Sequence, residues 1–146
     1  MKIYLDTSVY NRPFDDQTQP RIWLETLSLA LILQYVESDD ATLVNSTVLE
    51  FENSRNPFPL RQDWMTECLR LATEFQTVGE STRARAEQLE SIGMKAMDAL
   101  HVACAEEAHA DYFLTCDDRL VNKRKHLKIK PYNPVEFVQK IIGVQP

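Results

Sequence analysis

Glycine is scarce in this sequence, which has three glycines among 146 residues. Loops that hold phosphate groups in P-loop and dinucleotide-binding proteins need several glycines at fixed spacing. The sequence therefore lacks both kinds of nucleotide-binding loop. Histidine is equally rare, and His101, His109 and His126 have no partner at the spacing of a metal site. A histidine-based zinc site is excluded on the same ground.

Cysteine occurs as an odd number of widely spaced residues, Cys68, Cys104 and Cys116, without a Cys-x-x-Cys pair. This pattern matches neither a zinc site nor a disulfide framework, and it is typical of a protein of the reducing cytosol. Cys116 also lacks a neighbouring histidine base, so the sequence does not indicate a cysteine nucleophile.

Long apolar runs are absent as well. The longest, residues 22–36, is interrupted by Glu25, Ser28 and Gln34 and is too short and too polar to cross a bilayer. The N-terminus reaches Asp6 before the apolar region of a signal peptide can form. We therefore expect a soluble, cytoplasmic protein.

Acidic residues outnumber basic ones by 22 to 16, which gives a formal net charge of −6. A negative protein binds a polyanionic nucleic acid poorly unless its local charge differs from the sum. Five basic residues do fall close together near the C-terminus: Lys123, Arg124, Lys125, Lys128 and Lys130. A nucleic-acid partner therefore stays open.

The chain has the size and composition of one globular domain, to which we assign residues 1–146. Apolar and alternating segments predict strands at residues 2–5, 41–44, 111–115 and 127–132. Helical spacing and end signals predict helices at residues 20–37, 47–53, 60–75, 81–91, 95–110, 117–125 and 134–142. Short apolar strands separated by long helical segments are typical of an α/β fold with a mainly parallel sheet.

Three acids follow the predicted strands. Asp6 comes directly after the first strand, and Asp117 follows the third by two residues. Glu50 lies in the first turn of the helix after the second strand. Because the carboxyl ends of parallel strands meet at one edge of a sheet, we expect these carboxylates at the edge where such sheets bind ligands.

Each of these acids also has a purely structural interpretation. Asp6 and Asp117 suit the N-cap position of the helix that follows. Thr47 to Glu50 matches the T-x-x-E pattern of a capping box. Taken one at a time, none of the three acids establishes a functional site.

Asp98 carries more weight, because it lies in a segment that is apolar nearly all round, residues 96–105. A buried carboxylate needs a partner, since burial otherwise costs several kcal/mol or forces protonation. Lys95, or His101 one turn further on, would supply a structural ion pair. The alternative is that Asp98 shares a cation with the other acids at the sheet edge.

Carboxylates that gather in one place repel one another unless a divalent cation lies between them. Oxygen ligands of this kind suit Mg²⁺ and Mn²⁺, which activate water and stabilise charge on a phosphate. The candidates for such a cluster are Asp6, Glu50, Asp98 and Asp117.

Two further acids compete for a place in this cluster. Asp118 is adjacent to Asp117 and would point elsewhere in a helix, and Glu52 lies on a different helix face from Glu50. We interpret His101 as a packing or supporting residue rather than a catalytic one.

The sequence resembles the PIN-domain family, which includes the VapC-type toxins of bacterial toxin–antitoxin systems. Four motifs in this order carry the resemblance: Ile3 to Ser8 (IYLDTS), Thr47 to Glu50 (TVLE), Asp98 to Ala105 (DALHVACA) and Phe113 to Asp117 (FLTCD). The closing segment, Ile129 to Phe137, also looks like that of the family. The resemblance covers essentially the whole chain.

This resemblance implies a three-layer α/β/α sandwich and a Mg²⁺- or Mn²⁺-dependent endoribonuclease that acts on single-stranded or structured RNA. By position, Asp6 and Asp98 would be the principal metal ligands, Asp117 would complete the site, and Glu50 would ligate the ion or position water. Thr7 and Thr115 would hydrogen-bond these groups from behind. In the toxin members an antitoxin covers the site and homodimers are usual.

Two other functions remain open at this point. A non-catalytic module of the same fold would bind a protein partner through its helices, above all through the apolar segment 22–36 with Trp23 and Tyr35. A haloacid-dehalogenase-like phosphatase would use Asp6 as a nucleophile, but that family has a second aspartate two residues on, where this sequence has Ser8.

The segment 11–17 departs from the usual toxin pattern, as does the long helix predicted after Pro20. Asp15 and Asp16 in this segment add negative charge near the expected site entrance, where they would narrow substrate choice or bind a cation themselves.

Overall fold

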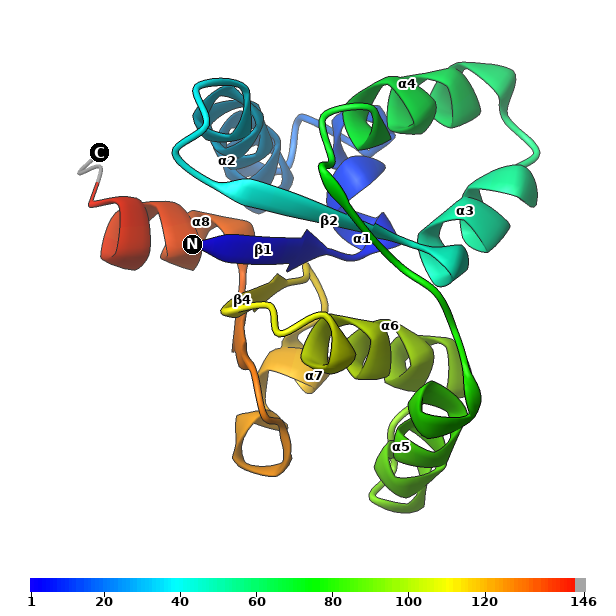
Figure 1. Cartoon of the computed structure of the whole chain (residues 1–146). Coiled ribbons are helices and arrows are strands. Elements are labelled where there is room, and N and C mark those ends of the chain that lie inside the picture. The colour runs from blue at the N-terminus through cyan, green and yellow to red at the C-terminus, as the bar shows by residue number, and fades with distance from the viewer. Residues whose placement is uncertain (144–146) are drawn as a thin grey trace.

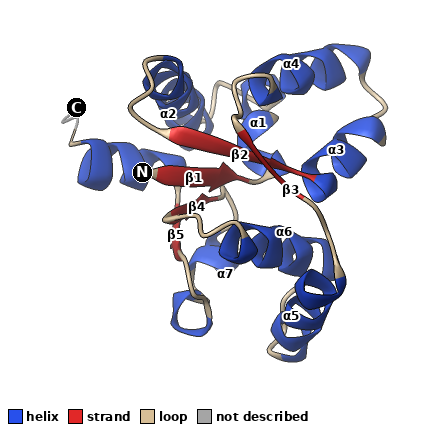
Figure 2. Ribbon diagram, viewed as in Figure 1, coloured by secondary structure: helices blue, strands red, loops and turns tan. Residues whose placement is uncertain are grey.

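A computed structural model describes residues 1–143, and within them the chain forms a five-stranded parallel sheet with the strand order β3-β2-β1-β4-β5 (Figures 1 and 2). The strands are β1 (Lys2–Leu5), β2 (Thr42–Ser46), β3 (Glu74–Gln76), β4 (Tyr112–Leu114) and β5 (Lys130–Tyr132). All four strand pairings are parallel, as the sequence predicted. The order reverses beside β1, which therefore lies at the centre of the sheet.

Helices cover both faces of this sheet, which gives the expected three-layer α/β/α architecture (Figure 2). They are α1 (Thr7–Tyr10), α2 (Pro20–Glu37), α3 (Thr47–Ser54), α4 (Pro59–Leu69), α5 (Glu80–Ser91), α6 (Ala96–Glu107), α7 (Asp118–Val121) and α8 (Pro134–Phe137). Helices α5 and α6 pack together on one face, while α2 packs against α8 on the other. Shorter helical turns span Arg12–Phe14, Arg124–His126 and Val138–Ile142.

The central strand is buried on both faces, because helices lie above and below it. Ile3, Tyr4 and Leu5 are completely inaccessible to solvent. Phe113 on β4 is equally buried, and its ring stacks on that of Tyr4 with 5.5 Å between centroids. Strands that are apolar on both faces are what a helix-covered parallel sheet requires.

One strand was not predicted. Residues 60–75 were expected to be a single helix, but α4 ends at Leu69 and β3 follows at Glu74–Gln76. As the edge strand, β3 exposes Glu74 and Phe75, so it carries no buried apolar pattern. The helix predicted at residues 117–125 is also divided, into α7 and a short 3₁₀ turn.

No helix within residues 1–143 is both long enough and apolar enough to span a membrane. Helix α2 instead has two apolar faces. One packs into the core through Ile32 and Leu33 among others, and the other stays exposed at Trp23, Leu24, Leu27 and Leu31.

Candidate functional site

Asp6 lies at the carboxyl end of β1 and is almost completely buried. Its Oδ1 atom accepts hydrogen bonds from the Ser8 backbone N–H at 3.0 Å and from the Ser8 hydroxyl at 2.5 Å. Asp6 is therefore the N-cap of α1, and the structural interpretation from the sequence is confirmed. Burial raises the pKa of Asp6, against the opposing effects of His101 and of the Ser8 and Thr115 hydroxyls.

Asp98 lies in the first turn of α6 and is half-buried. Within residues 1–143, no side chain or backbone group hydrogen-bonds its carboxylate. Burial and then the negative charge of Asp117 raise its pKa, and Glu52 adds to this effect, while His101 and Lys95 oppose it. The ionised form of Asp98 is thus destabilised by burial and by the negative charges of Asp117 and Glu52.

Asp117 is the N-cap of α7, as its structural interpretation predicted. Its Oδ1 accepts a hydrogen bond from the Arg119 backbone N–H at 2.9 Å, and both its oxygens lie 3.3 Å from guanidinium nitrogens of Arg119. Partial burial alone would raise the pKa of Asp117, but the bonds from Arg119 outweigh it and the pKa is lowered. Asp117 therefore stays ionised beside Asp98.

The structure turns Glu52, and not Glu50, toward this group. Glu50 is exposed, and its Oε1 accepts a hydrogen bond from the Asn45 amide at 2.7 Å. Glu52 accepts a hydrogen bond from the Thr7 hydroxyl at 2.6 Å and contacts His101 Nε2. Burial would raise the pKa of Glu52, but the bonds from His101 and Thr7 lower it overall.

The spacing of apolar residues in α3 points to Glu52, but the T-x-x-E motif favoured Glu50 instead. Ser46, one residue earlier than Thr47, caps α3 by accepting a bond from the Leu49 backbone N–H at 3.1 Å, so the predicted capping box is wrong. The buried residues Val48 and Leu49 define the inner face of α3. Glu52 follows them by four and three residues and therefore shares that face.

A buried chain of hydrogen bonds fixes Glu52 from behind. His101 is buried, and its Nδ1 lies 2.7 Å from the Tyr4 hydroxyl. The Tyr4 hydroxyl in turn lies 2.7 Å from Ser46 Oγ. Because a buried polar group needs a partner, this chain fixes the imidazole orientation and through it the Glu52 carboxylate.

Thr115 supports the opposite side of the group. It is completely buried, and its Oγ1 accepts a hydrogen bond from the Asp117 backbone N–H at 3.1 Å. The Thr115 hydroxyl also lowers the pKa of Asp6 by hydrogen bonding. Thr115 thus contacts Asp117, beside which the sequence placed it, whereas Thr7 contacts Glu52 rather than any of the four acids predicted from the sequence.

These acids suit a divalent cation by their chemistry, because hard ions prefer carboxylate oxygens. Burial and repulsion by other carboxylates raise the pKa of Asp6 and of Asp98, and a bound cation would relieve both effects. Within residues 1–143, no three Asp, Glu, His or Cys side chains lie close enough together to bind one metal ion. The Asp117 carboxylate pairs with the Arg119 guanidinium, so it would have to leave this ion pair to bind a metal ion.

A cleft of about 160 Å³ opens beside the acids, between the start of α6 and α7. Asp98 and Asp117 line it, together with three cationic side chains and part of the turn before α6: Gly93, Met94, Lys95, Arg119, Leu120 and Lys123. The cleft therefore brings two acids of the candidate site and three cationic side chains into one lining.

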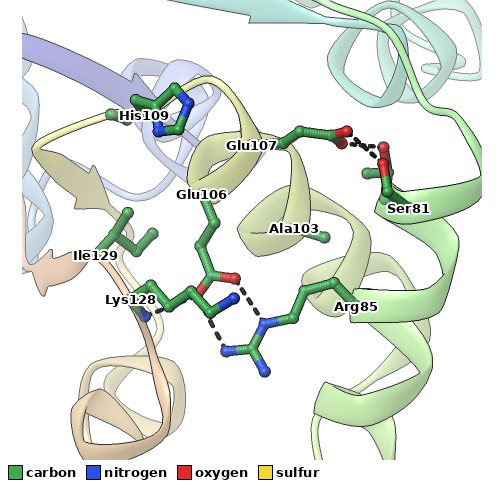
Figure 3. Close-up of a pocket in the computed structure, with 10 residues that line it drawn as sticks. Ser81, Arg85, Ala103, Glu106, Glu107, His109, Lys128 and Ile129 are labelled. Carbon is green, nitrogen blue, oxygen red and sulfur yellow. Dashed lines mark hydrogen bonds and ion pairs between the residues drawn. The ribbon is translucent and has the colours of Figure 1, made fainter.

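A larger cavity of about 530 Å³ lies elsewhere, between α5, α6 and the segment that leads into β5 (Figure 3). Its acids already have partners. Glu106 accepts from Arg85 Nε at 2.7 Å, and Glu107 accepts from the Ser81 and Thr82 hydroxyls. These bonds tie α5 to α6, and the cavity contains none of the candidate residues.

The acidic residues that flank the site are engaged elsewhere. Asp118 accepts two hydrogen bonds of 2.8 Å from the Arg21 guanidinium, so it points away from the site as expected. Asp15 pairs with Arg12 at 3.1 Å, and Asp16 accepts bonds from the Thr18 backbone and hydroxyl. None of these contacts brings Asp15 or Asp16 to the candidate site.

Comparison with known proteins identifies the fold. A family model described as PIN domain matches residues 3–126. The structure of FitAcB from Neisseria gonorrhoeae is similar, with 21% identity and a TM-score of 0.56 over 90% of this chain and 97% of that chain. VapBC2 from Rickettsia felis, bound to a DNA fragment from their promoter, has 15% identity and a TM-score of 0.57 over 91% and 98%. No curated protein matches this chain.

Proposed function

This chain belongs to the PIN-domain family, and on that premise we propose that it is a Mg²⁺- or Mn²⁺-dependent endoribonuclease that hydrolyses RNA phosphodiester bonds. PIN domains are in general nucleases. The observation that carries the proposal is a group of neighbouring acids. Asp6 and Asp117 follow central strands, and Glu52 and Asp98 approach them from α3 and α6.

In this proposal Asp6, Asp98 and Asp117 are the metal ligands, and Glu52 takes the role that the sequence motif suggested for Glu50. Glu52 contacts Thr7 and His101 and adds to the negative charge at Asp98, whereas Glu50 is exposed and bonded to Asn45. When bound, the divalent ion would lower the pKa of a coordinated water and stabilise charge on the phosphate.

The protein's own contribution is to hold these carboxylates rigidly. The cap of α1 fixes Asp6, and the buried chain through His101 and Tyr4 fixes Glu52. The lowered pKa of Glu52 favours a ligand or water-orienting role over that of a proton acceptor, because a base of low pKa accepts a proton weakly.

The test is cleavage of labelled RNA by the wild-type chain with Mg²⁺, Mn²⁺ or EDTA. Single-stranded DNA of the same sequence and a small phosphomonoester serve as alternative substrates. We expect RNA to be cut internally with either metal, and EDTA to abolish the reaction. Release of phosphate from the monoester without RNA cutting would favour the phosphatase instead.

We further propose a protein partner, an antitoxin, and a homodimer, as the resemblance to VapC-type toxins implies. The support is the exposed apolar face of α2, where Trp23 remains 51% exposed and Leu27 44% exposed. Apolar side chains gathered on one exposed face mark a protein contact more often than scattered ones do. The three free, buried cysteines suit the cytoplasmic location that we include in this proposal.

Two measurements test these partners. Light scattering of the purified chain reports whether it is a dimer, and Leu27→Glu is expected to make it monomeric. Co-expression with the product of a neighbouring gene tests for an antitoxin, which would suppress RNA cleavage. A partner bound to a chain that neither binds Mn²⁺ nor cuts RNA would favour the non-catalytic module.

A further inference from the structure

We propose that the cleft beside the acids is a binding subsite for one backbone phosphate of the RNA, held by the ammonium groups of Lys95 and Lys123. This inference rests on the proposed nuclease function, and it adds where the strand lies and which residues hold it. No sequence motif singled out either lysine for this role.

The cleft connects the two kinds of group that a phosphodiester substrate needs. Asp98 and Asp117 line one part of it and belong to the proposed metal site. Lys95, Arg119 and Lys123 add three cationic side chains to the same lining. A strand whose scissile phosphate lies at the acids therefore meets positive charge along this lining, within one cleft.

Lys123 lines the cleft beside the turn that precedes α6. A methyl group at Gly93 would lie 3.6 Å from Lys123 Nζ, at ordinary van der Waals distance, so the ammonium lies next to this glycine. Gly93 also has a φ of +97°, which side-chain-bearing residues rarely adopt. The positive φ thus favours glycine at this position of the turn, beside the Lys123 ammonium.

The two lysines are available to a ligand. Within residues 1–143, neither Lys95 nor Lys123 takes part in an ion pair. Arg119, in contrast, is bound to Asp117. Cationic side chains without an acidic partner, facing a cleft of an otherwise acidic protein, complement an anionic ligand.

The size of the cleft indicates a phosphate rather than a nucleotide base with its sugar. Its volume of about 160 Å³ is below the roughly 300–1,000 Å³ of pockets that enclose whole small-molecule ligands. Its lining carries no aromatic side chain on which a base could stack. A tetrahedral anion on the backbone of a strand suits both features.

The structure also separates Lys123 from the other lysines of the basic stretch. Lys128 lines the larger cavity near His109, and Lys130 begins β5 and is exposed. Asp6 and Asp117 follow the carboxyl ends of β1 and β4, whereas Lys130 begins the parallel strand β5, so Lys130 lies at the opposite edge of the sheet. Lys130→Ala is therefore a matched control that removes the same charge far from the cleft.

The test measures binding of a fluorescein-labelled single-stranded RNA dodecamer by fluorescence anisotropy, in Ca²⁺ buffer and over a series of KCl concentrations. The proteins are wild type, Lys95→Ala, Lys123→Ala and Lys130→Ala, matched for melting temperature. Each cleft variant is expected to bind about 5–10-fold more weakly at low salt and to lower the slope of log K against log[KCl] by about 0.7. Lys130→Ala should behave as wild type.

Cleavage of the same RNA in Mg²⁺ by the wild-type chain, measured in parallel, separates the two proposals. If the wild type cuts RNA and the cleft variants keep its affinity and salt slope, the subsite is wrong and the nuclease stands. If Lys130→Ala loses as much as Lys95→Ala, binding follows total charge and the subsite is again wrong. A wild type that neither binds nor cuts RNA overturns both proposals.

Discussion

The carboxylate of Glu52 is held by the imidazole of His101, a residue on a different helix and 49 positions further along the chain. The other ring nitrogen of His101 lies 2.7 Å from the Tyr4 hydroxyl. The central strand β1 thus supports the acidic site in two ways. Asp6 follows the strand directly, and Tyr4 within the strand positions Glu52 through His101. Buried hydrogen bonds of this kind restrict an acid to one orientation, which a metal site needs.

Substitutions of Glu52 and Glu50 test which of these two acids belongs to the proposed site. Glu52→Gln is expected to lower kcat/KM for RNA by about 100-fold, because it removes a carboxylate from the acidic group and disturbs the bond to His101. Glu50→Gln, two residues away on the exposed face of α3, should change it by less than about threefold. Single-turnover cleavage rates measure both. A large loss in Glu50→Gln with little effect in Glu52→Gln would restore the motif's choice.

Asp98→Asn is expected to raise the melting temperature of the chain in EDTA at pH 7. The ionised Asp98 is repelled by Asp117 and Glu52, and a neutral amide of similar shape removes this repulsion. Each kcal/mol gained would raise Tm by about 2–4 °C. Adding Mn²⁺ should stabilise the wild type by mass action and the variant much less. Differential scanning fluorimetry with both proteins provides the measurement, and equal stabilisation by Mn²⁺ would argue against Asp98 as a ligand.

The same pair of proteins yields a pH dependence. The pKa of Asp98 is raised in the folded chain, so its protonated form is favoured by folding. Its stabilising contribution is complete below the unfolded pKa of about 3.9 and is lost as the pH rises through the folded pKa. In EDTA, the Tm advantage of Asp98→Asn should therefore be small near pH 4 and grow toward pH 7. An advantage that shrinks with rising pH would contradict the direction of the shift.

Glu25→Ala is expected to destabilise the fold by about 3–5 kcal/mol, because it leaves a partly buried cation without its partner. The Glu25 side chain is 0% exposed and pairs with Arg12 Nη2 at 2.8 Å and with Asn133. Glu37→Ala, at the exposed end of the same helix, should lie within about 0.5 kcal/mol of wild type. Urea unfolding midpoints compare the two. Equal midpoints would mean that the buried network contributes nothing to stability.

Much of the fold follows from local pattern. The strand predicted at residues 2–5 and the helix predicted at residues 20–37 have the same bounds in the structure, since burial and end signals mark both clearly. The edge strand β3 was missed because an exposed edge imposes no apolar alternation. Its parallel pairing with β2 depends on the crossover through α3 and α4, which lies outside the strand itself.

Part of the candidate site could also be predicted from local sequence pattern. Asp98 stood out because a carboxylate in an apolar helix needs an explanation, and Asp6 and Asp117 because they follow strands. Glu52 was passed over because the T-x-x-E motif favoured Glu50, and Glu52 lies on a different face of the same helix. Glu25 gave no signal of its own, since its partner Asn133 lies 108 residues away in the sequence.

We propose above all that the acids around Asp98 form a metal-dependent ribonuclease site. The most direct test is cleavage of a mixed pool of single-stranded and structured RNA by wild type and by Asp98→Asn, each with Mn²⁺, Mg²⁺ or EDTA. We expect cutting by the wild type with either metal, none in EDTA, and none by the folded variant under any condition. Cutting by Asp98→Asn at the wild-type rate, or a folded wild type that is inert with both metals, would contradict it.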